Sequence, residues 1–158
     1  MSAPRHGHGS RHRTGTGSVL LRSAALGVAA GSRASLGVAG PVLTSGAGRL
    51  TRWPVLLGVA GELAGDKLPS APSRVDPPGP QSRAVSAATG AVALARRARR
   101  PVWSAALVAA AASTVGTWGG AAWRGWAARR GPDWRGALVE DAVAIALTAL
   151  ACRESPRR

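Results

Sequence analysis

The composition of this 158-residue chain limits the classes of protein to which it can belong. At this length it forms one domain, and its single cysteine, Cys152, excludes both a disulfide framework and a cysteine-based metal site. Hydrophobic residues make up 46% of the chain, but Phe and Tyr are absent, so a soluble core would bury little area. The net charge of +14 has three possible explanations: binding to nucleic acid, binding to anionic lipid, or basic loops that flank membrane-spanning segments.

The positions of the arginines decide between these partners. They gather at the ends of apolar runs, as in helices that end at lipid headgroups, and not on one face as in a nucleic-acid binder. The clusters are Arg49 with Arg52, residues 96–100, Arg129 with Arg130, and residues 153–158. We therefore predict a multi-pass protein of the cell membrane, with the bilayer and either a second copy or another membrane protein as partners, and no nucleic acid.

The first part of the chain predicts a tail followed by an interrupted helix. Residues 1–18 are polar and are expected to form a disordered basic tail. A first helix follows over residues 19–46, and Pro41 is expected to kink it or end it early.

The second helix is predicted over residues 53–67, opened by Trp53 and Pro54, with Arg49 and Arg52 in the preceding loop. Residues 70–81 contain several prolines and predict an extended connection.

Three further apolar segments complete the chain. Residues 84–95 are short for a membrane span, which needs ~20 residues. Residues 101–123 carry no charge and pass that test, and residues 134–152 predict a last helix before a frayed basic tail at 154–158. The predicted fold class is all-α: a small integral-membrane bundle of four or five helices in one domain over residues 19–153.

Glycines at four-residue spacing mark the expected packing seams of this bundle. Gly27 and Gly31 lie in the first helix, and Gly116 and Gly120 in the uncharged segment. This spacing lets two helix backbones approach closely.

Charged residues inside the apolar segments form the candidate site. Glu62 and Asp66 share a helix face, so two ionised carboxylates there require a cation, and Arg33 and Arg124 are the expected partners. The full candidate cluster is Arg33, Glu62, Asp66, Lys67, Arg74, Arg124, Glu140 and Asp141. Such a cluster either binds an ion, a proton or a headgroup, or consists of salt bridges that hold helices in register.

Catalytic motifs are missing from the sequence. It contains no nucleophile elbow, phosphate-binding loop or His–Glu metal motif, and its histidines, at positions 6, 8 and 12, fall in the tail. We predict that the protein is not an enzyme and uses no metal or cofactor.

The central stretch resembles the hallmark of a bacterial family of small integral-membrane proteins of unknown function. The pattern is Glu62-Leu63-x-x-Asp66-Lys67-Leu68-Pro69-x-x-Pro72-x-Arg74, flanked by Gly31-x-Arg33-x-Ser35, by Gly116-Thr117-Trp118-Gly119-Gly120 with Arg124, and by Glu140-Asp141-Ala142. The resemblance covers about residues 20–152 and implies a helical membrane domain, without a substrate.

Two functions are consistent with these features. The first is ion or small-solute handling by the charged cluster, and the alternative is a non-catalytic structural or partner-binding membrane subunit. A soluble, arginine-rich nucleic-acid binder is a third class. Acids that line a wet cavity favour the first function, and acids that are each bonded to an arginine in a dry interface favour the second.

Overall fold

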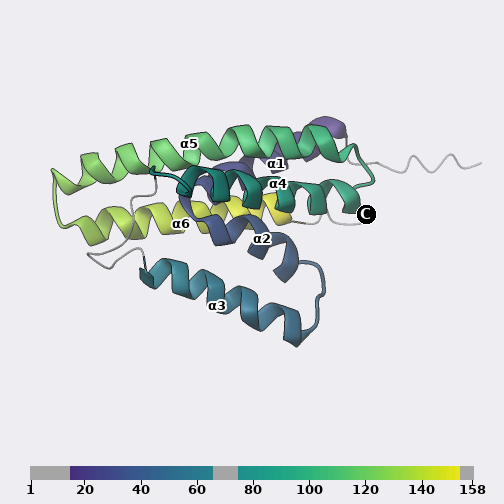
Figure 1. Ribbon diagram of the computed structural model, residues 1–158, viewed down its shortest axis with the longest axis horizontal. Coiled ribbons are helices and arrows are strands. Elements are labelled where there is room, and N and C mark those ends of the chain that lie inside the picture. The colour runs from purple at the N-terminus through teal and green to yellow at the C-terminus, as the bar shows by residue number, and fades with distance from the viewer. Residues whose placement is uncertain (1–14, 66–74, 154–158) are drawn as a thin grey trace, which may run out of the picture.

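The computed structural model describes residues 15–65 and 75–153, and within these ranges its regular secondary structure is entirely α-helical (Figure 1). Six helices follow one another there: α1 Thr16–Ser32, α2 Ala34–Leu43, α3 Arg49–Gly65, α4 Gly79–Arg97, α5 Val102–Ala128 and α6 Asp133–Cys152. The remaining parts of the predicted tails, residues 1–14 and 154–158, lie outside the described residues.

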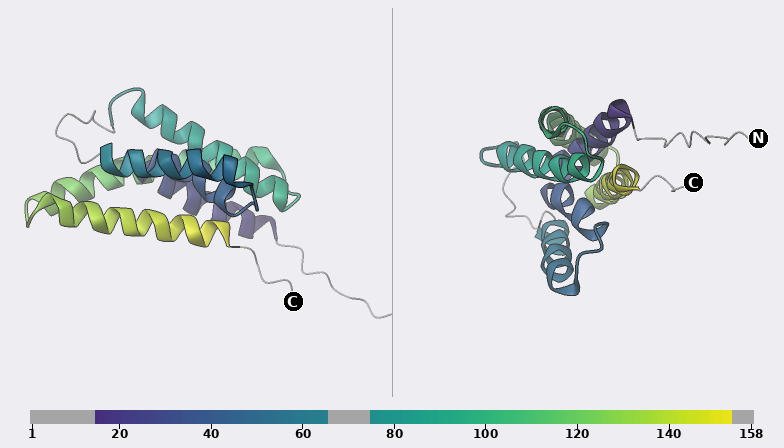
Figure 2. Two further views of the ribbon diagram at one scale, coloured as in Figure 1. Left: turned by 90° about the horizontal axis from the view of Figure 1, so that it is seen from below. Right: turned by 90° about the vertical axis from the view of Figure 1, so that its right-hand side faces the viewer.

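The helix α1 lies at the centre of the bundle and contacts α2, α4, α5 and α6. Figure 1 shows α4, α5 and α6 running along the long axis beside it, and α3 at the outer edge below α2. The end view in Figure 2 shows the same separation of α3 from the other helices. α3 makes its principal contact with α2.

The core of the bundle consists of small side chains, and larger apolar side chains lie outside. Most of the buried apolar residues are alanines: Ala29, Ala30, Ala39, Ala87, Ala91, Ala95, Ala105, Ala109, Ala137, Ala144 and Ala151. By contrast, Leu21, Leu50, Trp103 and Leu107 are between 70% and 93% exposed. The helices therefore approach closely, and their bulkiest apolar groups face outward.

The break in the first predicted helix falls at Arg33 and not at Pro41. Arg33 has an extended backbone, with φ −139° and ψ 104°, whereas Pro41 lies inside α2. Proline there removes the donor that would bond the Gly37 carbonyl, which instead faces Gly90 of α4. α2 ends two residues later, at Leu43.

Three other predicted boundaries also differ. α1 begins at Thr16, inside the predicted tail, and α3 begins at Arg49, so Arg49 and Arg52 are helical. α4 begins at Gly79, because Pro80 occupies a first-turn position where its missing N–H costs nothing. Residues 66–74, which include part of the expected extended connection, lie outside the described residues.

The predicted bundle of four or five membrane helices is wrong. Among the described residues only α5, with 27 residues, is long and apolar enough to cross a membrane. α1 and α3 have 17 residues each and α2 has 10, which is short of the ~20 that a span needs. α4 and α6 carry Arg83, Arg135, Glu140 and Asp141 in their sequences. Multi-pass insertion is therefore not supported.

Candidate functional site

The break between α1 and α2 creates two helix ends inside the bundle. Arg33 is the C-cap of α1 and the N-cap of α2, so the last carbonyls of one helix and the first N–H groups of the other meet there. Neither set has partners within its own helix. The first carries partial negative charge and the second partial positive charge.

A guanidinium and a hydroxyl complete the end of α1. Arg83 of α4 donates from Nη1 to the carbonyls of Gly31 and Ser32, at 2.9 Å each. The Oγ1 of Thr117 in α5 lies 3.2 Å from the same Gly31 carbonyl and 2.9 Å from the Ser113 carbonyl, so its single hydrogen is shared between these two acceptors. Arg83 is only 7% exposed, and its positive charge lies where the dipole of α1 favours a cation.

A carboxylate completes the start of α2. Glu62 of α3 accepts the backbone N–H groups of Ala34 and Ser35 at 2.7 Å each, and the Ser35 hydroxyl at 2.5 Å. The carboxylate thus occupies an anion position at a helix N-terminus. Its Oε1 lies 3.9 Å from Nη2 of Arg83, so opposite charges stand at the two ends of the break.

Arg33 itself links the break to α6. Its Nε donates to Oδ1 of Asp141 at 2.7 Å, and its Nη2 lies 2.5 Å from the same oxygen. The Arg33 side chain is 1% exposed and that of Asp141 is 11% exposed. The break is therefore joined to α3, α4, α5 and α6 by polar contacts.

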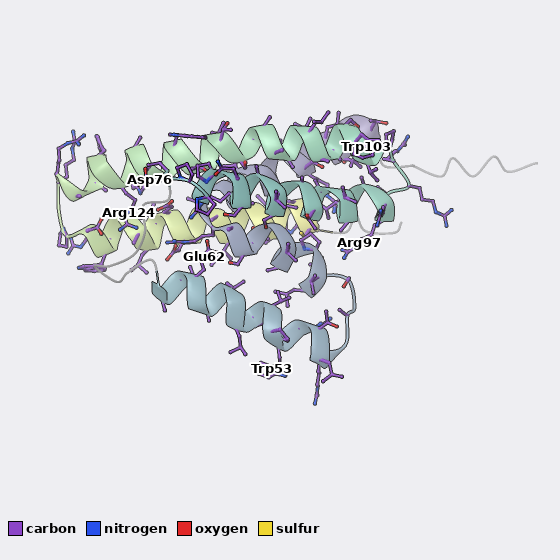
Figure 3. All side chains as sticks on the ribbon, in the orientation of Figure 1. Trp53, Glu62, Asp76, Arg97, Trp103 and Arg124 are labelled. Carbon is purple, nitrogen blue, oxygen red and sulfur yellow. The ribbon has the colours of Figure 1, made fainter. Side chains whose placement is uncertain are left out.

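A second set of charges lies at the turn between α5 and α6. Arg124 donates from Nε and Nη2 to the two carboxylate oxygens of Asp133, at 3.0 and 2.5 Å, and its Nη1 is 3.8 Å from Oε2 of Glu140. Trp123 donates from Nε1 to the Gly136 carbonyl at 3.0 Å. Figure 3 shows Glu62 pointing from α3 toward the bundle and Arg124 at the α5–α6 end.

The predicted cluster members lie in two adjoining sets. Arg33, Glu62 and Asp141 lie at the helix break, and Arg124 lies near Glu140, which is next to Asp141 in α6. The expected pairing of Glu62 with Arg33 or Arg124 is replaced by its bonds to the start of α2. Three other members of the cluster lie outside the described residues: Asp66, Lys67 and Arg74.

Sequence reasoning missed three contributors. Arg83 and Asp133 were not among the predicted site residues, and Thr117 appeared only within the Gly116-Thr117-Trp118-Gly119-Gly120 motif. Asp133 alone carries a local signal, because it follows Pro132 and begins α6, where the helix dipole favours an acid.

Most of the predicted packing glycines lie at the contact of α1 with α5. A Cβ added to Gly31 would come within 2.8 Å of the Gly116 Cα, and one added to Gly116 within 2.9 Å of the Gly31 Cα. A Cβ on Gly27 would come within 2.9 Å of the Ala109 Cα. Gly120, one turn beyond Gly116, is half-exposed.

Arginines from neighbouring helices also complete two other helix C-termini. Arg22 of α1 donates to the Ala151 carbonyl near the end of α6 at 2.5 Å. Arg97 of α4 donates to the Pro41 carbonyl and, at 3.2 Å, to the Thr44 hydroxyl at the end of α2. These contacts hold helix ends together and place no reactive group.

The described residues contain no cluster of three or more His, Cys, Asp or Glu side chains that could hold a metal ion. The three histidines lie outside those residues.

Comparison with protein-family models, with curated proteins and with solved structures found no match. The resemblance carried by residues 62–74 therefore stays a prediction.

Proposed function

We propose that this protein is a membrane-associated, non-catalytic structural protein whose outer surface contacts lipid. The observation that carries the proposal is where small, charged and large apolar side chains lie in the bundle. Alanine and paired charges fill the interior, and large apolar side chains cover the outside. Large apolar side chains on the outside are normally covered by lipid or by protein, and small residues at helix contacts are typical of helices packed in lipid.

The pairing of the acids supports a structural role over ion or solute handling. Asp141 is bonded to Arg33, Glu62 to the start of α2 beside Arg83, and Asp133 to Arg124. Carboxylates that neutralise a buried arginine or a helix end hold the helices in register, and an ion would have to break those contacts to bind.

The helix α5 is the element best suited to enter the hydrocarbon layer. Its 27 residues extend ~40 Å, more than the ~30 Å of a hydrocarbon core. Arg99 and Arg100 precede it, and Arg129 and Arg130 follow it. Near the second end Trp123 stacks on Trp126 with ring centroids 5.2 Å apart, as expected where a helix meets headgroups.

Nucleic-acid binding is less well supported by the arrangement of the arginines. Figure 3 places Arg97 and Arg124 at opposite ends of the bundle, and Arg33 and Arg83 are buried. A strand of nucleic acid needs its basic contacts on one face.

Fractionation tests the proposal. The protein is expected to stay in the membrane pellet through an alkaline carbonate wash and to float with lipid vesicles after detergent removal. Leu107→Lys, at a position 70% exposed on α5, is expected to reduce flotation, because a lysine in hydrocarbon costs ~2.5 kcal/mol or more.

The matched control is Arg129→Lys, which keeps a positive charge at the basic end of α5 and should leave flotation unchanged. Recovery of the wild-type protein in the soluble fraction, with salt-sensitive binding to DNA, would contradict the proposal.

A further inference from the structure

α3 rests on the bundle without being packed into it. None of its residues is buried, although it is 17 residues long. A Cβ added to Gly58, Gly61 or Gly65 would meet nothing within 4 Å, whereas one added to Gly37 of α2 would come within 2.8 Å of the Ser86 backbone. Figures 1 and 2 show α3 at the edge of the molecule, beside α2.

Glu62 supplies the side-chain hydrogen bonds that join α3 to the α1–α2 break. It accepts three, from Ala34 N, Ser35 N and the Ser35 hydroxyl, at 2.5–2.7 Å. The bonded groups lie at the positive end of α2, so the contact joins a charge to a dipole. Since no residue of α3 is fully buried, this polar contact is an important one among those that position it.

The two faces of α3 are both apolar. The half-buried residues Val55 and Val59 lie on the same side of α3 as Glu62, because the three positions are four and three residues apart. On the opposite side Leu50 is 93% exposed, Trp53 62% and Leu57 67%. Large apolar side chains on the outer side of a helix are normally covered by protein or by lipid.

The charges of α3 fit an anionic bilayer surface. Arg49 and Arg52 lie in its first turn, where the helix dipole disfavours cations. Arg49 is exposed and can reach headgroups, whereas Arg52 is half-buried and its Nε is enclosed. Its one acid, Glu62, is turned toward the bundle, so no carboxylate of α3 opposes anionic headgroups. Trp53 lies beside the arginines, as a headgroup-level anchor does.

We propose that α3 is a lipid-binding arm that Glu62 latches to the bundle. This inference rests on the proposed membrane association, and it identifies α3 as the helix that contacts the headgroups of an anionic bilayer. In the latched position Leu50, Trp53 and Leu57 face the lipid. When Glu62 is detached, Val55 and Val59 turn toward lipid as well, while the contacts among α1, α4, α5 and α6 keep the rest of the bundle folded.

Amide hydrogen exchange of the full chain in vesicles tests the latch. Glu62→Gln keeps the side-chain shape and removes the charge, and Glu62→Ala removes the bonds altogether. We expect both variants to raise exchange at Ala34, at Ser35 and along α3, about tenfold or more for Glu62→Ala, with α1 and α5 unchanged.

The matched control is Asp133→Asn, an acid that pairs with Arg124 and not with the helix break, which should leave α3 exchange as in the wild type. The latch is excluded if α3 exchange does not change in Glu62→Ala, or if α1 and α5 lose protection together with it.

Lipid contact is tested separately with a fluorophore and nitroxide-labelled lipid. In a Cys152→Ser background, a fluorophore is attached through Leu57→Cys or Val59→Cys, and the protein is placed in phosphatidylcholine vesicles containing phosphatidylglycerol. We expect quenching at position 57 in the latched protein, and quenching at position 59 to increase when Glu62→Gln is added.

The two proposals fail differently in this experiment. Protein that floats with the vesicles but is not quenched at position 57 overturns the arm and leaves membrane association standing. Protein that does not float overturns the proposed function itself, and the arm with it. Equal quenching in vesicles without phosphatidylglycerol would show that the arginines of α3 do not select anionic lipid.

Discussion

Arg33 and Asp141 form a buried ion pair that fastens the break between α1 and α2 to α6, with Nε and Oδ1 2.7 Å apart. The break is thereby held open in an extended conformation, and its two helix ends are left for Arg83 and Glu62. Local sequence alone would continue the helix, because Ala34, Leu36 and Ala39 are good helix formers.

The Arg33–Asp141 pair predicts strong coupling in a double-mutant cycle. Removing one partner of a buried pair typically costs ~3–5 kcal/mol, because the other charge is left uncompensated. We expect Arg33→Ala or Asp141→Asn to destabilise the bundle by about that much, and the double variant to cost less than the sum. Thermal unfolding in detergent measures the three changes.

The control for this cycle is Arg33→Ala with Trp103→Ala, a side chain that is 80% exposed at the start of α5, and the effects of these two changes should add. Additive effects for Arg33 and Asp141 would show that their contact contributes no coupling to stability.

The α1–α5 contact predicts opposite effects for two glycines of α5. A Cβ at Gly116 would come within 2.9 Å of the Gly31 Cα and the Ser32 N, so Gly116→Ala forces the helices apart. We expect a loss of ~1–3 kcal/mol, as for other overpacked sites. Gly119→Ala meets nothing within 4 Å and should stabilise α5 by ~0.5–1 kcal/mol. Melting temperatures that fall for both variants would contradict this assignment of the seam.

The end of α4 predicts a stabilising substitution. Arg99 has φ +53°, in the left-handed region, and the Arg100 N–H bonds the Ala95 carbonyl at 2.9 Å, which forms a Schellman motif. Glycine is favoured at this position, so Arg99→Gly should raise stability by ~1 kcal/mol. Arg96→Gly, three residues earlier inside the helix, should lower it by a similar amount. A lower melting temperature for Arg99→Gly would show that its side chain outweighs the backbone strain.

Cys152 predicts a pH-dependent reactivity. Burial raises the pKa of the Cys152 thiol, so the group stays protonated to a higher pH than an exposed thiol. Alkylation by a small maleimide should therefore be slow at neutral pH, and should accelerate only above the pH at which ordinary thiols ionise. The control is Arg153→Cys in a Cys152→Ser background, an exposed neighbour that should react faster at every pH below that range. Equal rates would mean that position 152 is open to solvent.

The helical class and the close-packing role of Gly27, Gly31 and Gly116 follow from local patterns that persist in the folded chain. Small residues four apart present a smooth surface wherever a second helix lies against them. The partners of the charges do not follow in this way. A carboxylate at position 62 can be placed on a helix face from sequence, but its acceptor role depends on a helix end that α1 and α2 create elsewhere.

The sequence by itself determined that the chain is helical, that its helix contacts are built on alanine and glycine, and that basic residues flank its one long uncharged segment. Composition and spacing act locally, so these properties are readable one segment at a time. Only the tertiary structure decided where the first helix breaks and which arginine serves which carboxylate or carbonyl. It also decided that Glu62 joins α3 to the start of α2. Those choices depend on helix ends and side chains brought together from distant parts of the chain. Charges and dipoles are screened in water, and their interactions become strong only where the fold places them close together and excludes water.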